Sequence, residues 1–188
     1  DRYYNGWECD GPAWCLGTDA NLKRVQTLAS VTDGTSNTAI FSEMVKGSGR
    51  GISATSKNGV GMVYSGASAR DAFSGQPNPM FLHYQDCRNK GLTLAWDYKG
   101  ERWITGETGR GGVYHHIMPP NQKSCFYSGL TTPQPTDAII TASSNHSGGV
   151  NVAMMDGSVK FIKDSISIPT WNALGTKGSG EVLSADSY

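Results

Sequence analysis

The stretch that decides the fold is Val150-Asn151-Val152-Ala153-Met154-Met155-Asp156-Gly157-Ser158-Val159-Lys160-Phe161-Ile162-Lys163. Apolar and polar residues alternate on both sides of Asp156-Gly157, as they do in two half-buried strands joined by a tight turn. Asp-Gly is typical of a type I′ turn, because both central residues of that turn need a positive φ. The sequence therefore predicts a β-hairpin over residues 150–163.

The predicted turn also fixes which residues face each other across the hairpin. A two-residue turn would set Val152 opposite Phe161 and Met154 opposite Val159. Together with Val150, these four side chains would then form one apolar face. We expect this face to line the core.

The sequence around the hairpin predicts a mainly β fold, α+β by a small margin. Residues 168–175 predict a short helix with Pro169 in its first turn and Gly175 at its C-terminal cap. Residues 39–45 predict another strand, and shorter extended segments are expected near 60–64, 96–104 and 113–118. We expect an antiparallel sheet with short helices and long glycine-rich loops.

Composition limits the class of protein. The chain has 188 residues, which suits one globular domain over residues 1–188, and 24 of them are glycine. Within it we expect an aromatic segment over 1–26 and a head over 27–188. Sixteen basic residues balance sixteen acidic ones, so a nucleic-acid partner is not expected. No apolar run is long enough to span a membrane.

Four cysteines, at positions 9, 15, 87 and 125, form no Cys-x-x-Cys pair, which argues against a zinc ribbon or a thioredoxin-type site. Two disulfides are the favoured interpretation, with four free thiols as the alternative. Three pairings are possible, and we favour Cys9–Cys15 with Cys87–Cys125. Disulfides would place the protein in an oxidising compartment, so we expect an extracellular, cell-surface or periplasmic location.

His146 and Asp156 are separated by nine residues. Nine residues of strand span roughly 30 Å, so the two side chains are not expected to meet or to share a metal. We expect Asp156, with Gly157, to form the turn. We expect His146 to fix the loop that leads into the hairpin through hydrogen bonds.

The oxygen-rich stretch Asp33-Gly34-Thr35-Ser36-Asn37 has two interpretations. Calcium is a weak possibility, with Asp33 and Asn37 as ligands, but the alternating acidic pattern of an EF-hand is missing. The favoured interpretation is a structural Asx-turn that leads into the strand. No other cofactor is expected.

Other chemistry-bearing residues give weaker signals. His115 and His116, with His83 and His146, could form a metal cluster, but adjacent histidines on a strand point to opposite faces. Trp7 and Trp14, near Tyr3 and Tyr4, could bind a carbohydrate, although such aromatics more often pack beside a disulfide. No known catalytic motif is present, so we do not expect an enzyme.

Several segments together resemble a known family. Thr32-Asp33-Gly34-Thr35-Ser36-Asn37-Thr38, Pro119-Pro120-Asn121 and Ser144-Asn145-His146-Ser147-Gly148-Gly149-Val150-Asn151, followed by Asp156-Gly157, carry the resemblance. They are similar to the prepilin-type family named for its signature of a His, a nine-residue gap and Asp-Gly. This family is abundant in planctomycetes and is often described as a domain of unknown function.

The resemblance implies a pilin-like globular head that normally follows a membrane-anchoring N-terminal helix. Because the chain begins at Asp1 without that helix, we expect a processed, clipped or subcloned chain that meets a membrane only through the missing helix. The expected partners are other pilin-like subunits or further copies of the chain. The alternatives are a secreted module that binds carbohydrate or another ligand and, less favoured, an extracellular hydrolase.

Overall fold

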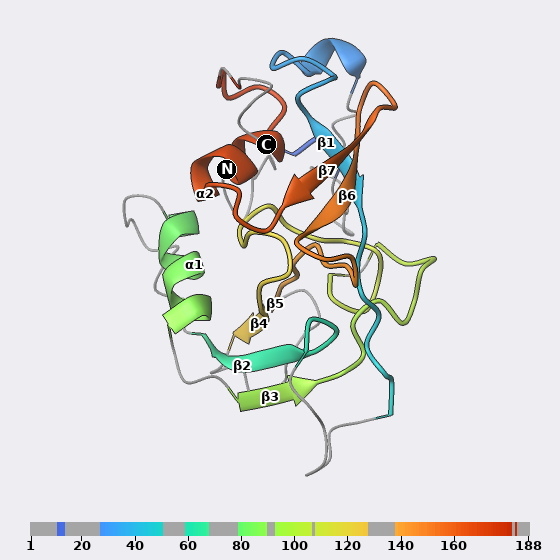
Figure 1. Cartoon of the computed structure of the whole chain (residues 1–188), viewed down its shortest axis with the longest axis vertical. Helices are drawn as coiled ribbons and strands as arrows, with labels where there is room; N and C mark the ends of the chain where they lie inside the picture. Colours follow the sequence, from blue (N-terminus) through green and yellow to red (C-terminus); the bar gives the residue numbers. More distant parts are fainter. Residues whose placement is uncertain are drawn as a thin grey trace, which may run out of the picture.

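A computed structural model describes residues 11–13, 27–50, 59–67, 79–89, 93–106, 108–127, 138–181 and 183 of the chain (Figure 1). Seven strands form two small sheets within these residues. The sheet at the upper right, here called the hairpin sheet, has the order β1 (Ala39–Ser42), β6 (Gly149–Met154) and β7 (Val159–Lys163). The short 3-10 helix η2 (Leu28–Ser30) precedes it.

The second sheet, here called the mixed sheet, has the order β3-β2-β4-β5. Its strands are β2 (Val63–Ala67), β3 (Thr93–Trp96), β4 (Ser124–Tyr127) and β5 (Ala138–Ile139). β2 pairs with β4 in parallel, whereas all other strand pairs in both sheets are antiparallel. Helix α1 (Pro79–Asn89) lies beside β2.

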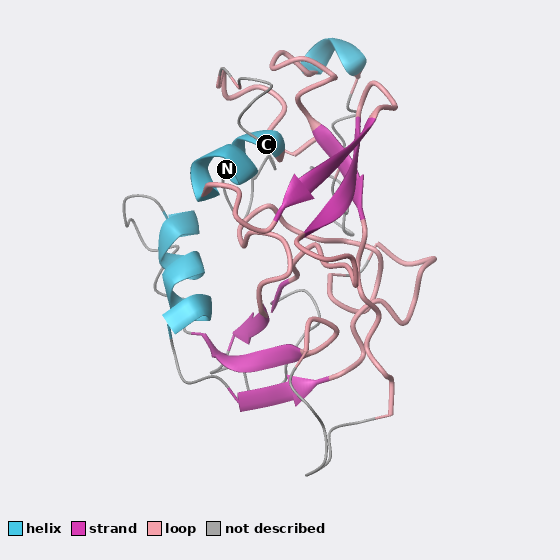
Figure 2. Ribbon diagram, viewed as in Figure 1, coloured by secondary structure: helices cyan, strands magenta, loops and turns pink. Residues whose placement is uncertain are grey.

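The predicted mainly β fold is confirmed, and long loops connect its short strands (Figure 2). The strand pairing is mainly antiparallel, as expected, with β2–β4 as the exception. Residues 113–118, predicted as strand, contribute only an isolated bridge between Thr108 and Val113, and residues 116–118 are bends. No helix of the described part of the chain is long and apolar enough to cross a bilayer.

The predicted hairpin is present, but its register differs from the prediction by one residue. Val152 pairs with Lys160 and Val150 pairs with Ile162. The cause is the turn: Gly157 N–H donates to Met154 O, and Gly157 has a φ of +87°. Three residues, 155–157, rather than two therefore separate the facing residues Met154 and Ser158, as in a type I turn followed by a bulge glycine.

This register changes which side chains reach the core. Val150, Val152 and Met154 are buried as predicted, and Ile162 joins them. Val159 and Phe161, expected in the core, are instead 65% and 46% exposed on the opposite face. A shift of one residue moves an entire strand's side chains to the other face, so one extra turn residue explains both errors.

Helix α2 (Ile168–Leu174) covers the inner face of the hairpin sheet. Ser167 caps its N-terminus by accepting a hydrogen bond from the Thr170 N–H at 3.2 Å. Gly175 is the C-cap, as predicted, but its φ is −87°, so its role is not conformational. A Cβ there would lie 2.4 Å from the Cβ of His116, so the site requires glycine for space.

The core has three clusters of buried side chains. The largest joins the hairpin sheet to α2 through Val150, Val152, Ile162, Trp171 and Leu174. A second surrounds the Cys87–Cys125 disulfide, which is formed as predicted and ties α1 to β4. The third lies on the mixed sheet around Val63, Phe126 and Ile140. Cys9–Cys15 lies outside the described residues.

Candidate functional site

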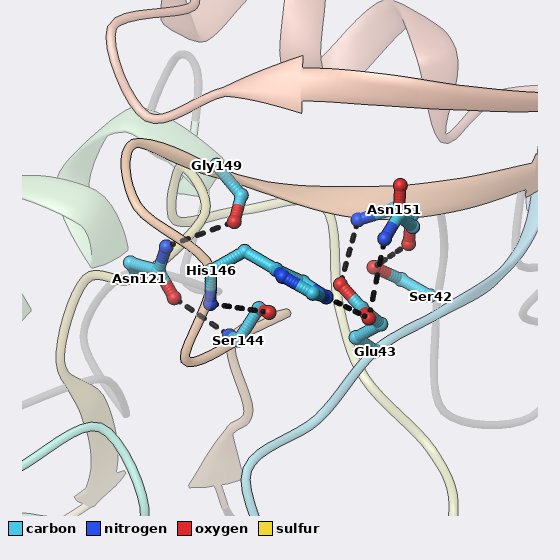
Figure 3. Close-up of polar contacts among 7 residues, drawn as sticks. All are labelled: Ser42, Glu43, Asn121, Ser144, His146, Gly149 and Asn151. Carbon is cyan, nitrogen blue, oxygen red and sulfur yellow. Dashed lines mark hydrogen bonds and ion pairs between the residues drawn. The ribbon is translucent and has the colours of Figure 1, made fainter.

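Two of the segments that carry the family resemblance meet beside the end of β1. The loop of residues 143–148, which leads into β6, lies between Glu43 on one side and Asn121 on the other (Figure 3). The cluster formed by Glu43, Asn121, Ser144, His146 and Asn151 is here called the loop clamp.

Glu43 forms one half of the loop clamp. Its Oε2 accepts from the Asn151 N–H at 2.8 Å, and its Oε1 accepts from the Asn151 amide at 3.3 Å. The same Oε1 lies 3.1 Å from His146 Nε2. Burial alone would raise the pKa of Glu43, but the hydrogen bonds from Asn151 and Ser144 and the proximity of His146 together lower it. The carboxylate is therefore held ionised.

Asn121 forms the other half. Its Oδ1 accepts from the Ser144 N–H at 2.8 Å, and its Nδ2 donates to Asp164 Oδ1 at 2.7 Å and to Gly149 O at 3.4 Å. Its backbone has a φ of 59°, a left-handed conformation that asparagine tolerates better than most residues. Asn121 thus joins the start of the loop to the end of the hairpin.

The arrangement can orient an imidazole at the surface, because the His146 side chain is 58% exposed. The order of the hydrogen bonds among Ser144, His146 and Glu43 differs from that in a serine hydrolase. In a catalytic relay the imidazole lies between the serine hydroxyl and the acid. Here the Ser144 hydroxyl accepts from the His146 main-chain N–H at 3.0 Å and also bonds to Glu43. The contacts of the loop clamp hold the loop in shape.

His146 and Asp156 have separate partners in the structure. Asp156 Oδ1 accepts from the Ser158 N–H at 2.9 Å and from the Ser158 hydroxyl at 2.7 Å, which stabilises the turn with Gly157. These hydrogen bonds lower the pKa of Asp156. Asp156 thus bonds within the turn, and His146 bonds to Glu43, a residue that sequence reasoning did not single out.

Residues 33–37 form a turn. The Asp33 carboxylate also accepts hydrogen bonds from a segment far away in the sequence. Asp33 Oδ1 and Oδ2 accept from the Gly180 and Ser179 N–H groups at 2.9 and 3.0 Å. Gly34 has a φ of +93°, and the Asn37 side chain donates back to Asp33 O at 3.3 Å. The segment thus ties the start of β1 to the loop after α2, while calcium binding by Asp33 and Asn37 stays a prediction.

The paired histidines bond to different parts of the fold. His115 Nδ1 accepts from the Ile140 N–H at 3.1 Å. His116 stacks on Trp171 with ring centroids 3.9 Å apart, and its Nδ1 lies 2.8 Å from Trp171 O. Burial lowers the pKa of each imidazole to about 4. A carbonyl only accepts, so the proton of neutral His116 lies on Nδ1.

Lys99 is a buried lysine that sequence reasoning did not single out. Its Nζ donates to Val60 O at 2.6 Å, to Ser143 Oγ at 2.8 Å and to Thr141 O at 3.3 Å. Its side chain has no solvent exposure, and burial lowers its pKa to about 7. None of these acceptors is charged. Lys99 Nζ also lies 3.5 Å from the Ser124 hydroxyl of β4, so this side chain links the mixed sheet to Ser143 at the start of the clamped loop.

The other binding candidates, Trp7 and Trp14, lie outside the described residues. The structure thus gives a β-rich, disulfide-bonded chain whose signature residues hold loops together. By sequence, the chain belongs to the family described as "Protein of unknown function (DUF1559)", which it matches over residues 7–168. No curated protein and no solved structure matches it.

Proposed function

We propose that this chain is the globular head of a pilin-like or pseudopilin-like filament subunit that works outside the cytoplasm. The observation that carries the proposal is the outer face of the hairpin sheet. Phe41 and Val159 on that face are 67% and 65% exposed, and exposed apolar patches mark interaction sites. A subunit that must contact its neighbours needs such a face.

Two further observations support this function. The Cys87–Cys125 disulfide favours an oxidising compartment. The segments that resemble the prepilin-type family supply every residue of the loop clamp except Glu43, and they also supply the hairpin turn, so their residues help to shape the loops of the head. A structural role accounts for these contacts without a catalytic one.

The coding region upstream of Asp1 and the mature N-terminus of the native protein test the proposal. We expect a prepilin cleavage site followed by an apolar helix of about 20 residues, long enough to span a bilayer. A conventional signal peptide that ends directly at Asp1 would contradict the proposal and favour a free secreted module.

A further inference from the structure

One loop of the molecule presents two large apolar side chains to solvent. Trp103 and Ile104, in the loop after β3, are 84% and 77% exposed. They occupy the two central positions of a turn closed by the Thr105 N–H, which donates to Arg102 O at 3.2 Å. In Figure 1 this yellow-green loop extends from the right side of the molecule.

The loop is braced on both sides of its tip. Gly100 N–H donates to Gly109 O at 2.9 Å, and Arg102 N–H donates to Arg110 O at 2.8 Å. The Arg110 guanidinium pairs with Glu101 and lies 5.2 Å from the centre of the Tyr98 ring. Such a tip loses little conformational entropy on binding, because it is already ordered.

The outer face of the hairpin sheet offers an apolar counterpart. Phe41 pairs with Ala153 and Ala153 pairs with Val159, so these three side chains cross the sheet in one row. Phe161 lies on the same face, opposite Asn151. We call these four apolar residues the apolar row. The packing with α2 involves the other face of this sheet.

Charges next to the two surfaces are complementary. Arg102 adjoins the tip, and its side chain is 51% exposed, with its Nε 3.4 Å from Glu101 Oε1. Arg110 pairs with the same carboxylate, so two arginines share one glutamate and the tip has an excess positive charge. Asp156, exposed at the hairpin turn, lies three residues before Val159 and is held ionised by its hydrogen bonds. The exposed Lys163 lies at the other end of β7, away from Val159. Lys160, next to Val159, also lowers the pKa of Asp156, and its Nζ donates to Ser36 O at 2.9 Å. An arginine that arrives at the Val159 end therefore meets a carboxylate with one lysine beside it.

We propose that the Trp103–Ile104 tip of one copy docks on the apolar row of the next copy, with Arg102 facing Asp156. This inference rests on the proposed function and names its subunit contact. The tip and the row are different surfaces of the same chain, so the contact is head-to-tail. Repeated head-to-tail contacts produce an open chain of subunits wherever the rotation between copies does not close into a ring.

Sedimentation of two variants, alone and mixed, tests the contact. Trp103→Glu removes the tip, and Val159→Glu places a carboxylate in the row. Leu28→Glu is the matched control, because Leu28 is 69% exposed but lies in η2, outside both surfaces. Circular dichroism checks that each variant is folded.

We expect the wild type and Leu28→Glu to form species larger than dimers as the concentration rises to about 1 mM, the range of weak contacts. Each of Trp103→Glu and Val159→Glu should stay monomeric. Their equimolar mixture should form a dimer and nothing larger, because it retains one intact tip and one intact row.

Three results would overturn the proposal. They are a monomeric wild type, association of either variant alone, and a mixture that stays monomeric. A monomeric wild type whose tryptophan fluorescence changes with oligosaccharides would favour the carbohydrate module instead. Filaments that contain the protein but assemble equally well with Trp103→Glu would refute this contact and leave the proposed function standing.

Discussion

Lys99 makes the folding stability depend on pH in a defined direction. The folded chain lowers the pKa of Lys99 from 10.5 to about 7, because burial disfavours the charged amine. Between these two pH values the unfolded chain holds a proton that the folded chain has released. Raising the pH therefore favours the folded state, and the gain is complete only above the unfolded pKa.

The magnitude follows from the shift in the pKa of Lys99. Each unit of pKa difference corresponds to about 1.4 kcal/mol, so the whole window from pH 7 to 10.5 is worth about 5 kcal/mol. In Lys99→Met this gain is lost. Lys99→Met also leaves Val60 O and Thr141 O without the donor that they have in the wild type. This loss should lower the free energy of unfolding of the variant by an amount that does not depend on pH.

Urea unfolding of the wild type and of Lys99→Met between pH 7 and 9 tests this reasoning. We expect the difference in unfolding free energy to grow by about 2 kcal/mol over that range. Lys163→Met, which removes an exposed lysine, should keep the wild-type slope. A difference between wild type and Lys99→Met that stays constant with pH would refute the burial argument.

Three further predictions test the packing. Asn121→Ala should lower the free energy of unfolding in urea by about 2–4 kcal/mol, because alanine makes no side-chain hydrogen bond to Ser144 and is strained at a positive φ. Asn121→Gly loses the same hydrogen bonds but tolerates the positive φ, so it should lower the free energy of unfolding by less. Gly175→Ala should lower the free energy of unfolding by about 1–3 kcal/mol in a thermal melt, because the new Cβ would lie 2.4 Å from the Cβ of His116. Gly59→Ala is the control, because its new Cβ would meet no atom within 4 Å, and it should leave the stability nearly unchanged. Replacing Cys87 and Cys125 with alanine should cost about 4 kcal/mol in urea, since the disulfide closes a loop of 38 residues, and an unchanged midpoint would contradict this.

The sequence predicts well those features that local signals decide. The Asp156-Gly157 turn, the alternation on β6 and the proline and glycine of α2 each act over a few residues, so the hairpin and helix are correct. The register failed because Asp-Gly serves two kinds of turn that differ by one residue. Nothing in the local sequence distinguishes them.

The loop clamp and the buried lysine depend on contacts between distant segments. Glu43 and Asn151 are 108 residues apart in sequence, and Lys99 and Ser143 are 44 apart. Asn151 lies in the alternating pattern of β6, but that pattern does not indicate its partner, and Glu43, Lys99 and Ser143 lie in no such pattern. A polar residue in a loop gives no sign of burial, so Lys99 resembles any exposed lysine until the fold encloses it.

Filaments sheared from cells of the native source test the central claim most directly. We predict that mass spectrometry finds peptides of this chain in the purified filament fraction, joined by a crosslink between the Trp103 loop and the hairpin sheet of a neighbouring copy. Recovery of the chain only as a free monomer in the medium, with none in the filaments, would contradict the claim.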